Sequence, residues 1–345
     1  MIREAIQKLV EKQSLTMEEA ALVMGEIMDG QVTPAQLGAF VTALRMTGET
    51  VEEIAGLART MRDRAIRVSP SGPVVDVVGT GGDGLNTFNI STAAAFVVAG
   101  AGVSVAKHGN RAASSQCGSA DVLEALGVRV ELTAPQVERC IETVGIGFML
   151  ATAFHPAMKH ASGPRREIGF RTVFNILGPL TNPAGARAQV IGVAGRKIGE
   201  KMAGALRLLG TRHALVVTGS NGMDEICLAG STHVWESTRF GTFDYQVEPG
   251  DFGFSRAALK TLSGGTAADN AQIVRAVLGG ERGPRRNIVV MNAAAALMVG
   301  DTRNGDGRHG VAGMVGCAGA AEESIDSGRA LAKLDGLVKF TRSLS

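Results

Sequence analysis

The sequence is poor in aromatic side chains, which make up 4 % of its 345 residues and include a single Trp and a single Tyr. Proteins that bind single-stranded nucleic acid stack bases on aromatic side chains, so the composition argues against that class. The net charge is +2, which provides no basic field for nucleic acid or for a membrane surface. We therefore expect neither as a partner.

Long apolar runs and clustered cysteines are also missing. No run approaches the roughly 20 apolar residues that span a bilayer, and the first residues alternate charge with apolar side chains instead of resembling a signal peptide. Cys117, Cys140, Cys227 and Cys317 lie far apart, without CxxC or Cys/His spacing. These absences predict a cytoplasmic protein whose thiols are packing groups, with a length sufficient for two domains.

Three capping boxes mark the first seventy residues as helical. In each, a threonine hydroxyl accepts a bond from the third helical amide, and a Glu or Gln at that position bonds back to the cap. The pairs are Thr16/Glu19, Thr33/Gln36 and Thr50/Glu53. Pro34 occupies the favoured first helical position, and Gly30 and Gly48 follow the second and third helices. Residues 1–72 are therefore predicted to form a small unit of four helices.

After the segment 69–73 (Ser-Pro-Ser-Gly-Pro), apolar strands alternate with helices. Predicted strands are residues 74–78, 103–106, 128–132, 189–193, 213–217 and 225–228. Predicted helices are residues 91–101, 118–126, 198–209 and 320–344. Such alternation is typical of a mostly parallel central sheet flanked by helices. The predicted fold class is α/β, a small all-helical domain plus a larger α/β domain, with polar chemistry at the carboxyl ends of the strands.

A glycine loop follows the first predicted strand, with the sequence GTGGDG at residues 79–84. Glycines allow a tight turn that brings several N–H groups onto one anion. The loop also matches the dinucleotide fingerprint GxGxxG. That motif requires a helix at its third glycine and an acidic residue after the next strand. Here the helix begins later and the next strand runs into Lys107, so we favour a phosphate loop.

Two further segments suit an anion. Asn89-Ile90-Ser91-Thr92 precedes a helix whose positive end can complete an anion site, although Ser or Thr there can equally be only a cap. Lys107-His108-Gly109-Asn110-Arg111 follows the next strand and leads into a serine-rich loop. A phosphate-gripping loop and a solvated basic loop both fit this second segment. We interpret His108 as a positioning residue and not as a base.

An acidic pair and an arginine-rich segment complete the candidates. Asp224 and Glu225 could hold Mg²⁺ together with substrate oxygens, or could be a surface acidic pair. The stretch FHPAMK at residues 154–159 is followed by Arg165, Arg166 and Arg171. An arginine fork suits a small carboxylate substrate. His155 fits a core position and a substrate-lining position equally well.

Seven segments in this order resemble the anthranilate phosphoribosyltransferase family. They are GTGGD (79–83), NIST (89–92), KHGNR (107–111), GSADVLEALG (118–127), FHPAMK (154–159), RTVFNILGPLTNP (171–183) and GMDEI (222–226). The resemblance implies transfer of the phosphoribosyl group of phosphoribosyl pyrophosphate (PRPP) to anthranilate in tryptophan biosynthesis. The products would be N-(5-phosphoribosyl)anthranilate and pyrophosphate. It also implies a homodimer, and a helical domain of residues 1–72 with a second contribution from roughly 160–185, beside an α/β domain of 73–159 and 186–345.

The resemblance assigns roles to individual residues. PRPP would contact Gly79, Gly81, Gly82, Asp83, Thr87, Asn89, Ile90, Ser91, Thr92, Lys107, His108, Gly109, Asn110, Arg111, Ser114, Ser115 and Ser119. Anthranilate would contact Gly79, Asn110, His155 and Arg165. Two Mg²⁺ ions would be held by Ser91, Asp224 and Glu225. No residue would act as acid or base, because Lys107 and the metal ions would stabilise the leaving group.

The sequence departs from the family at two places. Thr152 stands where the family usually has proline, and Gln116-Cys117 where it usually has a basic residue and serine. Two alternatives share the fold. A pyrimidine nucleoside phosphorylase would need a free-phosphate site and no Asp-Glu metal pair. A non-catalytic nucleic-acid-binding relative would show a basic groove and eroded magnesium ligands. The segment GMDEI and the near-neutral charge favour the transferase.

Overall fold

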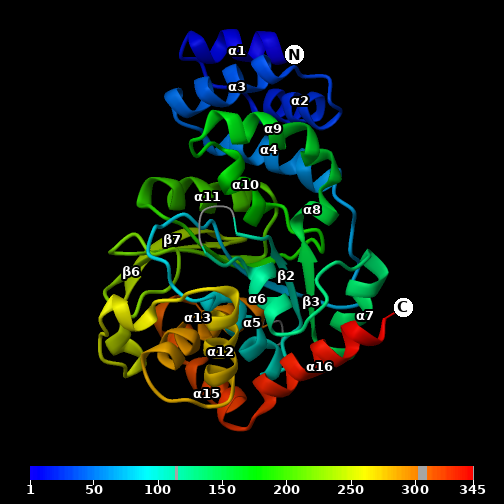
Figure 1. Ribbon diagram of the computed structural model, residues 1–345. Coiled ribbons are helices and arrows are strands. Elements are labelled where there is room, and N and C mark those ends of the chain that lie inside the picture. The colour runs from blue at the N-terminus through cyan, green and yellow to red at the C-terminus, as the bar shows by residue number, and fades with distance from the viewer. Residues whose placement is uncertain (113–115, 302–308, 345) are drawn as a thin grey trace.

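A computed structural model of the chain describes residues 1–112, 116–301 and 309–344. The first part is a stack of four helices at one end of the molecule (Figure 1). They are α1 (Ile2–Val10), α2 (Met17–Met28), α3 (Pro34–Thr47) and α4 (Val51–Asp63). The three predicted capping boxes are confirmed at the starts of α2, α3 and α4. Gly30 and Gly48 follow α2 and α3 with positive φ, as a chain reversal after a helix requires.

The larger part contains one seven-stranded sheet in the order β3-β2-β1-β4-β5-β6-β7. The strands are β1 (Val75–Gly79), β2 (Val105–Gly109), β3 (Ile146–Leu150), β4 (Ala188–Gly192), β5 (His213–Gly219), β6 (Thr232–Thr238) and β7 (Gly241–Val247). The first five run parallel, while β6 and β7 form antiparallel pairs. The strand order reverses between β1 and β4, which is where open α/β sheets bind ligands.

Helices cover both faces of the sheet. The helices that follow β1 in the described residues are α5 (Ile90–Gly100), α6 (Ser119–Ala125), α7 (Ala134–Val144), α8 (Ala151–Phe154), α9 (Lys159–Ile168), α10 (Phe174–Leu180), α11 (Arg196–Leu208), α12 (Ala267–Leu278), α13 (Pro284–Gly300), α14 (Gly310–Val315), α15 (Ala318–Asp326) and α16 (Arg329–Ser343). Among them, α9 and α10 pack on the helical stack. The largely buried helices α5 and α13 pack on each other and on β1. On β5 and β6 lies α11, which also contacts α4. The predicted α/β class with a mostly parallel sheet is confirmed.

The segment between β3 and β4 connects the helical stack with the sheet. Its helix α9 packs against α2 and α3, while α10 contacts α4 (Figure 1). Apolar side chains of α9 and α10 share one buried cluster with the four N-terminal helices. Helices α9 and α10, from the middle of the sequence, thus pack with the N-terminal helices. The division into domains at the residues given above stays a prediction.

The strand predicted at residues 128–132 is wrong. Val128, Val130 and Leu132 alternate inward as a strand would, but β3 occupies the place beside β2. The segment instead lies against α16, where the Arg129 amide donates to Thr341 Oγ1 and the Arg129 guanidinium donates to the Leu344 carbonyl. The alternation of buried and exposed residues indicates which side of a segment is buried. It does not indicate which neighbouring segment the backbone bonds to.

The strand predicted at residues 225–228 is also wrong. The Ile226 amide donates to Asn292 Oδ1 at 2.9 Å, the Asn292 amide group donates back to the Ile226 carbonyl, and the Cys227 amide donates to Thr232 Oγ1. Because side chains satisfy these buried backbone groups, the segment is a packed loop. Asn292 lies on α13, so this helix anchors the loop.

The predicted C-terminal helix at residues 320–344 is divided in the structure. Gly328 adopts a left-handed φ of 76° between α15 and α16. The sequence patterns described above do not predict β3 or the antiparallel strands β6 and β7. Among the described residues, no helix has both the length and the apolar character needed to cross a membrane.

The contact between α2 and α4 depends on Gly56. A methyl group at this position would overlap the carbonyl oxygen of Met17, and it would lie 2.9 Å from Ala20 Cβ. Gly56→Ala should therefore destabilise the protein by about 1–3 kcal/mol, as overpacked cores do. Gly38 on α3 is a matched control, since nothing lies within 4 Å of a methyl group there; Gly38→Ala should leave stability unchanged or raise it by up to about 1 kcal/mol. Thermal unfolding of both variants measures this, and equal midpoints would contradict the packing argument.

Candidate active site

The loop 222–226 lies against the carboxyl ends of β1 and β4. Asp224 Oδ2 accepts a bond of 2.7 Å from the amide of Gly81 in the glycine loop. A methyl group at Gly79 would overlap the Asp224 carboxylate, and one at Gly192 would overlap the Asp224 carbonyl oxygen. Both strands end in glycine because only a residue without Cβ allows this approach. The structure thus brings together two predicted segments that are about 140 residues apart.

Three carboxylates gather at this point. Burial and then the neighbouring Asp83 raise the pKa of Asp224 to about 6. Burial and then Asp224 raise the pKa of Glu225 well above its usual value, while Lys107 and the Ser91 amide oppose the shift. Asp83 Oδ1 accepts a bond from the Leu85 amide. Its buried Oδ2 has no partner among the described residues. The arrangement concentrates more negative charge than the surrounding side chains neutralise.

Lys107 is the cation beside these carboxylates. Its ammonium group is buried, donating to the Val77 carbonyl at 2.6 Å and to Ser91 Oγ at 3.4 Å. Burial lowers the pKa of Lys107, against the opposing charges of Asp76 and Glu225. Lys107 is therefore held at the strand ends, where it meets the start of α5.

Asp76 was not predicted, although it lies at the centre of this charge network. Burial raises the pKa of Asp76 to about 6, with Lys107 opposing the shift. The carboxylate accepts bonds from the His108 amide at 3.2 Å and from Asn182 Nδ2 at 2.7 Å. An acidic residue inside an apolar strand is the sequence signal that could have identified it.

The start of α5 lies beside the glycine loop. Asn89 Nδ2 donates to the Cys117 carbonyl, and Asn89 Oδ1 accepts from Asn270 Nδ2 at 2.9 Å. Ser91 is partly buried and next to Lys107, whereas Ile90 and Thr92 are buried. Of the PRPP residues predicted here, Ser91 lies beside Lys107, Asn89 is bonded to Cys117 and Asn270, and Ile90 and Thr92 are buried.

The loop after β2 is folded back on α6. The Asn110 carbonyl accepts from Ser119 Oγ at 3.3 Å, and a methyl group at Gly109 would overlap this hydroxyl. Arg111 donates to both oxygens of Glu124, so its guanidinium is engaged by acidic residues. Predicted residues Ser114 and Ser115 lie outside the described residues. Gly79, Gly81, Gly82, Asp83 and Thr87 are at or next to the glycine loop.

His108 and His155 form a buried pair with ring centroids 5.2 Å apart. His108 Nδ1 contacts the Gly178 carbonyl at 3.2 Å, and His155 Nε2 contacts the Thr181 carbonyl at 3.0 Å. Burial lowers the pKa of His108 to about 3 and also lowers that of His155. Both rings are therefore neutral near pH 7, and each bonds to the chain at the end of α10.

The arginines of the middle segment have separate environments. The Arg165 guanidinium lies over the Phe174 ring, 5.1 Å from its centroid, and burial lowers the pKa of Arg165. Among the described residues it has no ion pair. Arg171 donates to the Thr80 carbonyl at 3.2 Å, and a methyl group at Gly82 would overlap its guanidinium. Arg171 is one of the three arginines that the sequence suggests for a carboxylate, and it contacts the glycine loop directly.

Two family models together match most of the chain. Residues 71–331 match the glycosyl transferase family a/b domain, and residues 3–65 match the helical bundle domain of the same family. Anthranilate phosphoribosyltransferase of Dehalococcoides mccartyi is 54 % identical over 347 residues, covering 100 % of this chain and 99 % of the relative. That of Chloroflexus aurantiacus is 57 % identical over 344 residues, covering 99 % of both. This chain belongs to the anthranilate phosphoribosyltransferase family.

Solved structures of anthranilate phosphoribosyltransferases have the same fold over the whole length. The Thermus thermophilus enzyme matches with a TM-score of 0.91 at 43 % identity, covering 98 % of this chain and 99 % of that one. The Saccharomyces cerevisiae enzyme in complex with PRPP and Mg matches with a TM-score of 0.87 at 30 % identity. Its complex with 4-fluoroanthranilate also matches with 0.87, at 28 % identity. Both yeast structures cover 99 % of this chain and 98 % of their own.

In this member of the anthranilate phosphoribosyltransferase family, Gly192 is expected to set the position of Asp224. Gly192→Ala should displace the loop 222–226, and a displacement of about 1 Å can reduce kcat/KM about 100-fold. Gly72→Ala is the control, because Gly72 is exposed and nothing lies within 4 Å of a methyl group there. Steady-state kinetics with folded proteins measure the effect. Full activity of Gly192→Ala would show that this close contact does not position the carboxylates.

Proposed function

We propose that this chain transfers the phosphoribosyl group of PRPP to anthranilate, which gives N-(5-phosphoribosyl)anthranilate and pyrophosphate in tryptophan biosynthesis. The observation that carries the proposal is that Asp224 and Glu225 lie beside Asp83 of the glycine loop and close to the buried Lys107. Acidic side chains next to a phosphate loop suit a substrate that binds together with a cation. The relatives named above support anthranilate as the acceptor.

PRPP would bind where the glycine loop, the start of α5 and Lys107 meet. The Gly81 amide is engaged by Asp224, and the backbone amides of residues 82–84 and the positive end of α5 favour an anion. Lys107 points from β2 toward Ser91, 3.4 Å away. As the bond from the ribose C1 to pyrophosphate breaks, negative charge grows on the leaving group. Amides and an ammonium group that are already in place stabilise this charge without reorganising.

The carboxylates fit magnesium. Asp83 Oδ2 is buried without a partner in the described part of the chain. Burial raises the pKa of both Asp224 and Glu225, with Asp83 adding to the shift of Asp224 and Asp224 adding to that of Glu225. A cation relieves both penalties, and Mg²⁺ prefers carboxylates together with substrate phosphates. Ser91, Asp224 and Glu225 would hold two Mg²⁺ ions. These ions would neutralise negative charge on the diphosphate.

Anthranilate would bind between the strand ends and α9–α10, near Gly79, Asn110, His155 and Arg165. The guanidinium of Arg165 is partly desolvated over Phe174 and has no ion pair among the described residues, so it can pair with the anthranilate carboxylate. The aromatic amine is already neutral near pH 7 and can attack C1 without a strong base. The neutral His108 and His155 are consistent with that, because they position the chain at the end of α10.

The assembly proposed for this chain is a cytoplasmic homodimer. The exposed apolar side chains Val10, Leu22 and Met46 lie on α1, α2 and α3, and 84 % of Met46 is exposed. Apolar side chains on this end of the molecule support a dimer contact through the helical part. No nucleic-acid or membrane partner is proposed.

Loss of anthranilate fluorescence tests the function. Wild-type protein with PRPP and Mg²⁺ should consume anthranilate, and EDTA should stop the reaction. The double variant Asp224→Asn, Glu225→Gln should lose at least about 100-fold in rate, because the amides keep the shape but cannot hold magnesium. It should remain folded, since the side-chain oxygen that the substitution leaves at position 224 can still accept from the Gly81 amide.

Two outcomes would contradict this proposal. No fluorescence loss with folded wild-type protein that binds PRPP would exclude anthranilate as acceptor. The first substitution to test would then be Thr152→Pro, which introduces the residue usual in the family. Retained activity in the double variant would overturn the metal assignment while leaving the reaction intact.

Arg165→Ala should raise the KM for anthranilate by about 10- to 100-fold, because a charged hydrogen bond contributes about 1.5–3 kcal/mol. The KM for PRPP should change little. Arg166→Ala removes the adjacent, exposed guanidinium and is the matched control. Steady-state kinetics with each substrate varied in turn measure both constants. A change confined to the PRPP constant would show that Arg165 does not bind the carboxylate.

A further inference from the structure

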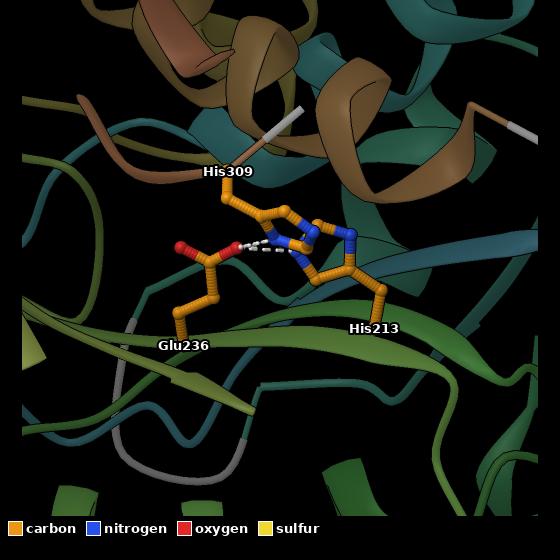
Figure 2. A group of neighbouring side chains, drawn as sticks. All are labelled: His213, Glu236 and His309. Atoms are coloured by element: carbon orange, nitrogen blue, oxygen red, sulfur yellow. Dashed lines mark hydrogen bonds and ion pairs between the residues drawn. The ribbon is translucent and has the colours of Figure 1, made fainter. Parts of the chain in front are cut away.

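A second cluster of ligand-type side chains lies away from the proposed substrate site. His213, Glu236 and His309 converge so that one ligand atom from each lies within 4.8 Å of the others (Figure 2). His213 Nε2 is 2.7 Å from Glu236 Oε1, and His309 Nδ1 is 2.6 Å from the same oxygen. The two imidazole rings are 4.9 Å apart between centroids. None of these residues belongs to the chemistry proposed above.

The sheet register explains why the cluster forms. Leu215 of β5 pairs with Glu236 of β6, so His213, two residues before Leu215, lies on the same face as Glu236 and diagonal to it. His309 directly precedes α14, which packs against α13 and β7. His213 begins β5, whereas the substrate site lies at the carboxyl ends of the parallel strands. His213 therefore places the cluster at the amino end of β5, opposite to the strand ends that form the substrate site.

The carboxylate is held in a fixed orientation. Glu236 Oε2 accepts bonds of 2.9 Å from the Tyr245 hydroxyl and from the Gly310 amide. Glu236 and His213 are buried, while 39 % of the His309 side chain is exposed. Oε1 therefore faces both rings, and His309 is the partly exposed member of the cluster.

We propose that His213, Glu236 and His309 form a binding site for a divalent transition-metal ion of the Zn²⁺ class. Two imidazole nitrogens and one carboxylate oxygen are a donor set that suits zinc and not magnesium. The Tyr245 and Gly310 bonds to Oε2 supply the outer support that oriented ligands require. Binding needs His213 Nε2 and His309 Nδ1 unprotonated, with each ring's proton on its other nitrogen. Such an ion ties the start of α14 to β5 and β6.

Zn²⁺ titration of the full-length protein tests this site. The protein is first stripped with EDTA, exchanged into buffer, and kept in excess Mg²⁺ so that oxygen-ligand sites are filled. Competition with a chromophoric chelator measures affinity, and the visible absorption of bound Co²⁺ reports nitrogen ligands. Wild-type protein should bind one equivalent and unfold at a higher temperature with Zn²⁺. His309→Ala and Glu236→Gln should weaken binding at least about tenfold and lose the thermal shift.

His233→Ala is the matched control. Like His309→Ala it removes one imidazole, but this imidazole is on β6 and outside the cluster. His233 pairs with Thr218 and therefore faces away from Glu236; it lies beside Trp235 and bonds to Arg196. This variant should bind Zn²⁺ like the wild type. Absence of one-to-one binding by the wild type, or equal binding by His309→Ala, would overturn the proposal and leave a hydrogen-bonded cluster. If Glu236→Gln does not fold, His309→Ala decides alone, since its side chain is partly exposed.

Discussion

The close approach of the loop 222–226 to the ends of β1 and β4 is the constraint on which the candidate active site depends. Gly79 and Gly192 end these strands without a Cβ, and the space that a side chain would fill is occupied by Asp224. From the other side, Asn292 on α13 bonds to both backbone groups of Ile226. The loop is held between the sheet and a core helix, so its carboxylates are fixed before any ligand binds.

Charge balance at this point is incomplete. Lys107 faces Asp76 and Glu225, while Asp83 and Asp224 repel one another at the edge of the glycine loop. A buried group that is not fully neutralised costs stability, and folded proteins retain such groups mainly where they have a function. The proposed cation, bound together with the diphosphate of PRPP, would neutralise the carboxylates that Lys107 alone does not.

The middle of the chain couples the helical stack to this site. Residues that follow β3 pack into the helical stack through α9, and they return to the sheet through α10. There His108 bonds to Gly178, and Arg171 bonds to Thr80 of the glycine loop. A shift of the helical stack relative to the sheet would therefore move the residues that contact His108 and the glycine loop. The His-Glu-His cluster lies at the amino end of β5, away from these contacts.

The sequence by itself determined those features that depend only on residues close together in the chain. The capping boxes need only residues three positions apart, and strands β1, β2, β4 and β5 are recognisable as apolar runs between turns. The glycine loop, Lys107, the Asp224-Glu225 pair and the family were likewise readable as motifs.

The tertiary structure alone decided which segments pair. Residues 128–132 have a strand's alternation, but β3 takes their place beside β2. Residues 225–228 resemble a short apolar strand, yet the Asn292 side chain bonds to their backbone. Sheet register and helix packing bring Asp76 close to Lys107. They also bring His213 close to Glu236 and His309. Those contacts join residues far apart in the chain, and no local pattern records them.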